Sequence, residues 1–126
     1  AGRVLGISVD EPLDVLQTRV AVLASETAEC LGAPATFEVD QIHVNADYTG
    51  DGYGILNSLD TEAVQLFAKW EGLLLDPVYT GRAAGGMIDL IRKGVFSSQE
   101  TVLFWHTGGN TALFAEKYRQ IVEQVL

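Results

Sequence analysis

Leu73-Leu74-Leu75-Asp76-Pro77-Val78-Tyr79-Thr80-Gly81 is the stretch of this sequence that decides its fold. A compact run of leucines ends at an acidic residue and a proline. A second stretch, Val102-Leu103-Phe104-Trp105-His106-Thr107-Gly108-Gly109-Asn110, repeats this change from apolar to polar residues. Short apolar runs bounded by Gly or Pro are typical of strands buried on both faces of a parallel sheet. We therefore expect strands over 73–75 and 102–105.

The polar residues that follow both runs predict a small-molecule site, because parallel sheets bind ligands beyond the carboxyl ends of their strands. The first run is followed by Tyr79 and Thr80, and the second by His106 and Thr107. Backbone N–H groups at the start of a helix can receive an anion, but the second segment also fits a tight turn. Both interpretations stay open at this point. Tyr79 and His106 could equally make structural hydrogen bonds at a strand end.

Strands and helices alternate along the whole chain. A strand over Val4–Val9 precedes a helix from Leu13 to Leu31, whose apolar residues are spaced to lie on a sheet and which Gly32 ends. The other expected elements are a weak strand over 37–45 and helices over about 61–71, 82–93 and 111–126. This order predicts an α/β fold: an open, mostly parallel sheet with helices on both faces, in three layers (α/β/α).

The apolar residues of the last two helices predict which of their faces are buried. The expected inner face of helix 82–93 consists of Ala83, Ala84, Met87, Ile88 and Ile91. That of helix 111–126 consists of Leu113, Phe114, Tyr118, Ile121, Val122 and Val125.

A glycine-rich loop, Asp47–Gly54, precedes helix 61–71. Its Gly50-Asp51-Gly52-Tyr53-Gly54 segment is only superficially like a dinucleotide-binding fingerprint, because Ile55 to Leu59 separate it from the next helix. We interpret the glycines as shaping the loop. Tyr53 is a candidate wall of a pocket, with a plain surface or packing position as the alternative.

Composition limits the possible functions. A chain of 126 residues suits one domain, and a net charge of −9 disfavours nucleic acid and anionic membranes as partners. Cys30 is the only cysteine, so we expect it to be packed on the apolar side of a helix in a cytoplasmic protein. Two histidines without spaced carboxylates predict no metal site. The start at Ala1, directly before an expected strand, suggests a fragment or a processed chain.

Three ordered motifs, 71–82, 86–94 and 102–109, resemble the C-terminal region of the D-cysteine desulfhydrase and 1-aminocyclopropane-1-carboxylate (ACC) deaminase family. These are pyridoxal 5'-phosphate (PLP) enzymes with a tryptophan-synthase β-like fold. The Asp47–Gly54 loop fits the family as well, so the resemblance covers residues 1–126 as a single α/β unit. It implies that the N-terminal half, with the Schiff-base lysine and the phosphate cradle, is absent from this chain.

The resemblance implies roles for individual residues. Tyr53 and Tyr79 match two tyrosines that reach the substrate and act as catalytic residues. Thr80 is the expected substrate-binding residue. The ACC deaminase branch typically carries Glu at position 80 and Leu at position 107, so two threonines favour the desulfhydrase branch. The expected cofactor-binding residues are Thr107, His106, Gly108 and Gly109.

The resemblance therefore implies PLP-dependent β-elimination of a small amino acid, with D-cysteine giving pyruvate, hydrogen sulfide and ammonia. We expect the chain alone to be inactive, and the complete protein to be a homodimer. An ACC deaminase or an L-cysteate sulfo-lyase is the alternative, and Arg82 is the nearby cation that could meet a sulfonate. The alternative from another class is a non-catalytic α/β ligand-binding module.

Overall fold

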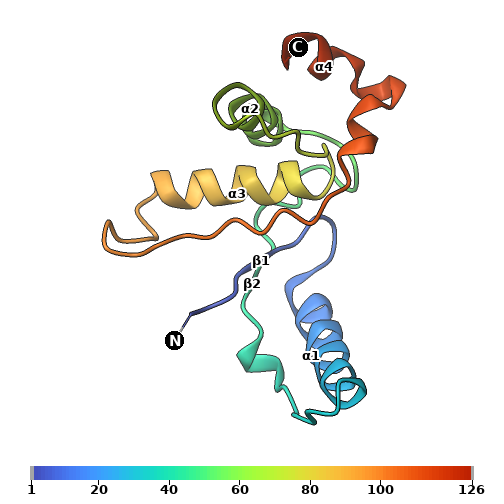
Figure 1. The fold of residues 1–126 in the computed structure, drawn as a ribbon, viewed down its shortest axis with the longest axis vertical. Coiled ribbons are helices and arrows are strands. Elements are labelled where there is room, and N and C mark those ends of the chain that lie inside the picture. The colour runs from blue at the N-terminus through green and yellow to red at the C-terminus, as the bar shows by residue number, and fades with distance from the viewer. Residues whose placement is uncertain (1, 126) are drawn as a thin grey trace. The chain divides into compact units, whose positions relative to one another are not determined.

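The computed structural model describes residues 2–125, without the side chains of residues 124 and 125. The chain divides into two compact units, residues 1–49 and 50–126, which are taken separately below. The first unit holds β1 (Gly6–Ile7), α1 (Leu13–Cys30), a 3₁₀ turn (Val39–Gln41) and β2 (Val44–Asn45). The second holds α2 (Ser58–Leu66), a π-helix (Phe67–Glu71), α3 (Thr80–Arg92), two 3₁₀ turns (Asn110–Phe114 and Glu116–Tyr118) and α4 (Arg119–Val125), as Figure 1 shows.

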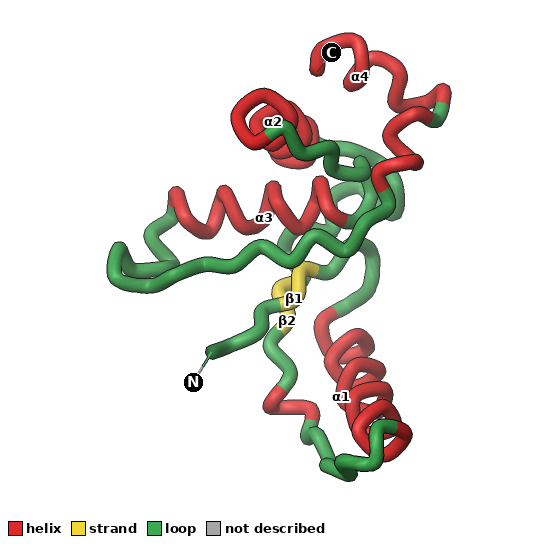
Figure 2. The backbone as a smooth tube through the Cα atoms, viewed as in Figure 1, coloured by secondary structure: helices red, strands yellow, loops and turns green. Residues whose placement is uncertain are grey.

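The first unit is a βαβ arrangement with a small parallel sheet, drawn in yellow in Figure 2. Gly6 pairs with Val44 and Ile7 with Asn45, and α1 makes the connection between the two strands. A parallel pair needs such a crossover, so this arrangement confirms the predicted α/β class. The paired region is shorter than the expected strands over 4–9 and 37–45, because the 3₁₀ turn at Val39–Gln41 interrupts the second of them.

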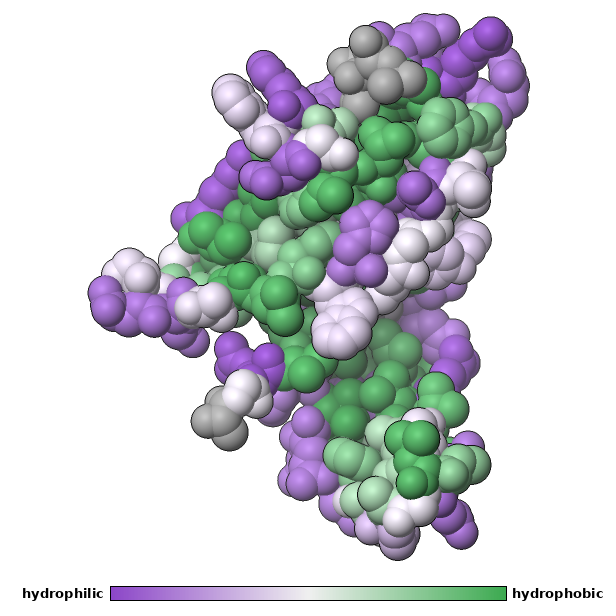
Figure 3. Space-filling model, viewed as in Figure 1, coloured by the Kyte–Doolittle hydropathy of each residue, from purple (hydrophilic) through white to green (hydrophobic). Residues whose placement is uncertain are grey.

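Helix α1 begins and ends where the sequence predicts, with Pro12 before its first residue and Gly32 at φ +70 after its end. Its expected burial is wrong for the described part of the chain. Leu23 is 60% and Leu31 77% exposed, Cys30 is exposed too, and Ala21 is the buried residue of the helix. Two strands of two residues each offer too little sheet to cover an 18-residue helix. Figure 3 shows apolar side chains on the surface over α1.

The core of the second unit lies where α2 and α3 pack together. Helix α2 begins at a reciprocal cap, in which Asn57 and Asp60 each accept a hydrogen bond from the other's backbone N–H. Gly85 brings α3 close to α2, because a Cβ there would lie 3.0 Å from the Leu59 carbonyl oxygen. The inner face of α3 includes Leu90, whereas Ile91, expected inside, is 48% exposed. The buried core residues are Ala63, Val64, Leu75, Ala84 and Leu113.

The expected strands over 73–75 and 102–105 are not formed in the described structure, where both segments are drawn as loop in Figure 2. A strand needs a neighbour, and no other strand of this unit is described to pair with them. Leu75 is fully buried, but Leu103 is 80% and Trp105 79% exposed, so burial on both faces is wrong for the second segment. Phe104, between them, packs against Phe67 with 5.2 Å between ring centroids.

The expected helix over 111–126 is broken into the two 3₁₀ turns and α4, because Ala115 is extended at φ −67 and ψ 143. Leu113 and Tyr118 are buried as predicted, but Phe114 is 61% exposed. Leu126 and the side chain of Val125, which the prediction included, lie outside the described residues. Within residues 2–125, no helix is both long enough and apolar enough to cross a membrane.

Candidate active site

Asp76 organises the first of the two polar segments. Its carboxylate is fully buried, and Oδ1 accepts the backbone N–H groups of Val78 at 2.8 Å and Tyr79 at 2.7 Å. Oδ2 accepts the backbone N–H of Thr80 at 2.7 Å and the Thr80 hydroxyl at 2.6 Å. These N–H groups belong to the first residues of α3 and those just before it, where a helix lacks internal acceptors. Asp76 therefore fixes the start of α3.

The same contacts control the charge of Asp76. Burial by itself raises the pKa of this carboxyl, but the hydrogen bonds from the Thr80 hydroxyl and from the three backbone N–H groups together lower the pKa below its ordinary value. A carboxylate at a helix N-terminus also gains from the helix dipole. Asp76 is thus an anion at neutral pH, and it accepts hydrogen bonds from the main chain around it.

Tyr53 and Tyr79 meet at the surface of the second unit. Tyr79 directly precedes α3, and Tyr53 comes from the glycine-rich loop. Their hydroxyl groups are hydrogen-bonded to each other, and their rings meet edge to face with 5.8 Å between centroids and 69° between planes. Tyr53 is 54% and Tyr79 49% exposed, so a ligand outside the unit can reach both rings. The structure brings together the two tyrosines that the sequence singled out.

Thr80 lies next to this pair but faces inward. Its side chain is 2% exposed, and its hydroxyl both donates to Asp76 and accepts the backbone N–H of Asp76, at 2.6 Å and 2.8 Å. These two bonds give Thr80 a structural part in the turn before α3. Its expected contact with the substrate stays a prediction.

The second polar segment is held by its histidine. Nδ1 of His106 accepts the backbone N–H of Gly108 at 3.0 Å, so the ring proton is on Nε2, which lies 3.2 Å from the Leu74 carbonyl oxygen. His106 therefore closes a tight turn and links it to the leucine segment. Thr107, at the tip of this turn, is exposed, and its hydroxyl makes no hydrogen bond within the described part of the chain.

The two polar segments meet at Asp76, although the strands that were expected to precede them are not formed, and a ligand crevice there stays a prediction. Gly109 has φ +84, and a Cβ on it would lie 3.1 Å from both Cγ and Oδ2 of Asp76. Only a glycine allows the turn to approach the carboxylate this closely. Asp76 thus touches the turn that carries Thr107 and, through Oδ1, the backbone of Tyr79.

Sequence reasoning missed Asp76 and misplaced Arg82. An acidic residue with Pro next to it and Thr four positions later, at the start of a helix, was the available signal for a helix-capping carboxylate. Arg82, the expected sulfonate contact, is 1% exposed and forms an ion pair with Asp60 at 3.0 Å. Its guanidinium is therefore enclosed by the protein, and the L-cysteate alternative loses the cation on which it depended.

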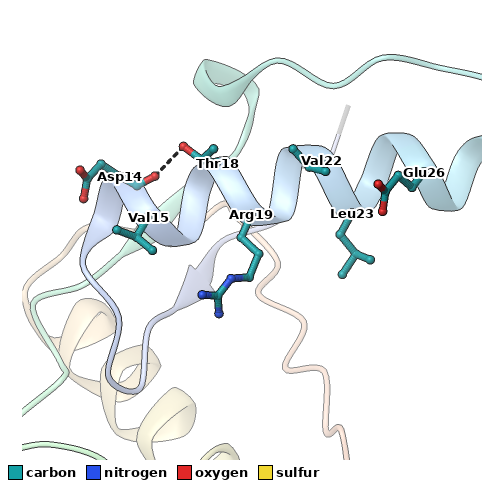
Figure 4. A pocket seen from close by; sticks show the side chains of 7 residues that line it. All are labelled: Asp14, Val15, Thr18, Arg19, Val22, Leu23 and Glu26. Atoms are coloured by element: carbon teal, nitrogen blue, oxygen red, sulfur yellow. Dashed lines mark hydrogen bonds between the residues drawn. The ribbon is translucent and has the colours of Figure 1, made fainter.

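A shallow hollow on the first unit is unrelated to these residues. Figure 4 shows it along one exposed face of α1, where its walls come from a single helix. None of the predicted site residues lines it. The lining residues are Asp14, Val15, Thr18, Arg19, Val22, Leu23 and Glu26.

Comparison with known proteins identifies relatives of this chain. No family model matches it. A D-cysteine desulfhydrase of Salmonella paratyphi C is 43% identical over 111 residues, which make up 88% of this chain and 33% of that protein. The D-cysteine desulfhydrase of Salmonella newport is 42% identical with the same coverage. A crystal structure of an ACC deaminase homologue superposes with a TM-score of 0.76 at 32% identity, covering 97% of this chain and 35% of that one.

The fold is thus that of one part of an α/β protein related to ACC deaminase. More particularly, the chain is similar in sequence to the C-terminal part of D-cysteine desulfhydrases and in structure to an ACC deaminase homologue, as its motifs predict. It spans about a third of the length of the curated relatives it matches.

Proposed function

We propose that this chain forms one wall of the active site of a PLP-dependent enzyme that eliminates the β-substituent of a small amino acid, with D-cysteine as the substrate. The observation that carries the proposal is the exposed pair of hydrogen-bonded tyrosine hydroxyls, Tyr53 and Tyr79. Both residues lie in a chain that is 43% identical to a D-cysteine desulfhydrase. Elimination of sulfide needs groups that hold and move protons near the leaving group, and phenol hydroxyls are such groups.

The residues present fit the cofactor. Thr107 has an exposed hydroxyl without a partner in the described structure, and it stands on a turn fixed by His106. A hydroxyl can donate to a pyridine nitrogen as a neutral hydrogen bond. In this proposal Thr107 meets the ring of PLP, and Gly108 and Gly109 shape the turn beside it. When bound, PLP supplies an electron sink for the carbanion at Cα.

In this proposal the tyrosine pair supplies a proton to the leaving group. Each phenol has one proton, and one of the two is used in the bond between the hydroxyls. With Tyr53 as the donor of this bond, Tyr79 keeps its own O–H proton, which can be donated to a departing thiolate. Thr80 stands behind Tyr79 and supports it through Asp76.

The rest of the protein supplies what this chain lacks. Because the chain covers 33% of its relative, we assign the lysine that binds the cofactor, the phosphate cradle and the dimer contacts to the other two-thirds of the complete protein. Residues 1–126 alone are then inactive. A cytoplasmic location belongs to the same proposal.

The test compares the complete protein with residues 1–126, each mixed with PLP and then with D-cysteine, L-cysteate or ACC. The expected result is sulfide and pyruvate release from D-cysteine by the complete protein, and neither turnover nor a protein-bound visible absorption band with residues 1–126. Faster 2-oxobutanoate formation from ACC would instead support the second candidate, an ACC deaminase, which the structural neighbour favours. No turnover of any of the three by the complete protein would contradict the proposal.

A further inference from the structure

Arg82 is a buried arginine on the first turn of α3, one helical turn after Tyr79. Its guanidinium donates to groups from two other segments. Nε and Nη2 lie 3.3 Å and 3.0 Å from Oδ2 of Asp60. Nη1 donates to the Gly52 carbonyl at 3.1 Å, and Nη2 also donates to the Ile55 carbonyl at 2.5 Å. One planar cation thus joins α3, α2 and the glycine-rich loop.

Asp60 holds the guanidinium of Arg82 in a fixed position. Its Oδ2 also accepts the backbone N–H of Asn57 at 3.1 Å, as part of the cap that begins α2. Asp60 is 1% exposed, so the ion pair is shielded from water and its geometry is constrained by the helix start. The position of the guanidinium is therefore set by α2 and α3, which share the core of this unit.

The two loop carbonyls that Arg82 binds lie on either side of Tyr53. Gly52 directly precedes Tyr53, and Ile55 follows it by two residues. Between them, the Gly54 carbonyl accepts the hydroxyl of buried Tyr118 at 2.8 Å. The loop has little regular structure of its own, since Gly52 and Gly54 have φ +126 and +69. Together with the backbone hydrogen bond from the Ile55 N–H to the Gly52 carbonyl at 3.3 Å, these side-chain bonds hold the backbone of Tyr53 in place.

We infer that Arg82 is a positioning residue, which holds the Tyr53 loop so that the Tyr53 hydroxyl meets the hydroxyl of Tyr79. Since Tyr79 directly precedes α3 and Arg82 lies on the first turn of α3, the start of this helix carries one tyrosine and the residue that holds the loop of the other. The catalytic importance of the two tyrosines rests on the proposed function. The role of Arg82 in holding the glycine-rich loop does not depend on it. Arg82 itself does not touch the substrate.

The first test measures hydrogen exchange of the Gly52–Ile55 amides in the complete protein. Arg82→Met keeps an unbranched stem and removes the donors of the side chain, and Asp60→Asn is combined with it so that no lone charge is buried. We expect these amides to exchange at least about tenfold faster than in wild type, as for a loop that opens locally. Arg82→Lys keeps a cation with three donors and should remain within about threefold of wild type.

A matched control is available on the same helix. Arg92 of α3 also pairs with an acidic residue of α2, since its Nη1 and Nη2 lie 2.7 Å and 2.8 Å from the Glu62 carboxylate oxygens, but it is far from the loop in sequence and exposed. Arg92→Met combined with Glu62→Gln should leave exchange at Gly52–Ile55 unchanged. Equal exchange in the two double variants would overturn the inference.

The second test asks whether Arg82 acts through Tyr53. In the complete protein, the Arg82→Met/Asp60→Asn pair should lower kcat for elimination about 10- to 100-fold, as expected for a small displacement of a reacting group, with KM changed less than about threefold. In a Tyr53→Phe background the same pair should change kcat by less than about threefold. A full additional loss in that background would overturn the inference. Absence of elimination in the wild-type protein would refute the proposed function, and hydrogen exchange would still decide the role of Arg82.

Discussion

At the scale of single residues, the buried carboxylate of Asp76 explains most of the local order around the candidate site. It accepts three backbone N–H groups and one hydroxyl, and it contacts the Gly109 backbone. Because its four donors come from consecutive residues before and at the start of α3, replacing it by Asn turns one acceptor into a donor that faces the Thr80 N–H. We expect Asp76→Asn to destabilise the complete protein by about 1–3 kcal/mol, measured by urea denaturation at pH 7.

The pH dependence of stability follows from the lowered pKa of Asp76. A carboxyl whose pKa is lower in the folded than in the unfolded state stabilises the fold fully above its unfolded value of 3.8, and this contribution is lost as the pH falls through the lower folded value. We expect the difference in unfolding midpoint between wild type and Asp76→Asn to be constant from pH 7 to about 5 and to shrink below about 4. A difference that grows on acidification would contradict this assignment.

Exposed Glu62 has a pKa lowered by its hydrogen bond to Arg92, so it titrates in the same acidic range. Glu62→Gln is therefore the natural control for the pH experiment. Since this pair is solvent-exposed, we expect the variant to follow the wild-type curve closely.

At the scale of elements, helices were more predictable from the sequence than strands. A helix satisfies its own backbone, so the stop signal at Gly32 was sufficient. Gly72 and Gly94, which follow the expected helices over 61–71 and 82–93, likewise have left-handed backbone. Strands 73–75 and 102–105 need partners that no pattern within the segment can supply. The two tyrosines could be predicted from the sequence because they lie in segments that resemble the family. The contacts of Arg82 with the glycine-rich loop could not be predicted from the sequence, because Arg82 binds backbone carbonyl groups, which every residue has.

The start of α3 gives the sharpest prediction at this scale. Gly81 has no Cβ, and one placed there would lie 2.7 Å from the Asp76 carbonyl oxygen and 3.1 Å from Cγ2 of Val64. Since the first neighbour is backbone, Gly81→Ala must displace the turn that precedes Tyr79. We expect it to cost about 1–3 kcal/mol of stability, as for other overpacked sites, and to lower kcat with it.

Gly94→Ala is the matched control for Gly81→Ala. Gly94 ends α3 at φ +70 with open space around it, so an alanine there meets only the backbone penalty of about 1 kcal/mol. Thermal unfolding of both variants of the complete protein, together with elimination rates, separates the two effects. Unchanged kcat in Gly81→Ala, with kcat lowered in Gly94→Ala, would reverse our assignment of the catalytic turn to the start of α3.

At the scale of the whole molecule, the exposed apolar side chains of the second unit fit the proposal that further residues of a longer protein cover them. Leu103 is 80% and Trp105 79% exposed, while Phe104 between them packs inward against Phe67. This alternation is that of a strand with one open face. Soluble proteins rarely leave such side chains together in water. The D-cysteine desulfhydrase of Salmonella paratyphi C is about three times as long as the matched segment, and in the proposed complete protein the further residues provide the cover.

Replacing Leu103 and Trp105 by serine tests whether these side chains are buried in the complete protein but exposed in residues 1–126 alone. In residues 1–126 alone, these side chains contact mainly water, so we expect the double variant to unfold at nearly the wild-type urea concentration and to bind less of an apolar dye. In the complete protein, the same double variant removes two buried side chains and should cost at least about 3 kcal/mol. The measurement is urea denaturation of all four proteins. An equal loss in both settings would mean that residues 1–126 already bury this face, whereas a loss confined to the complete protein would support the proposal that further residues cover Leu103 and Trp105.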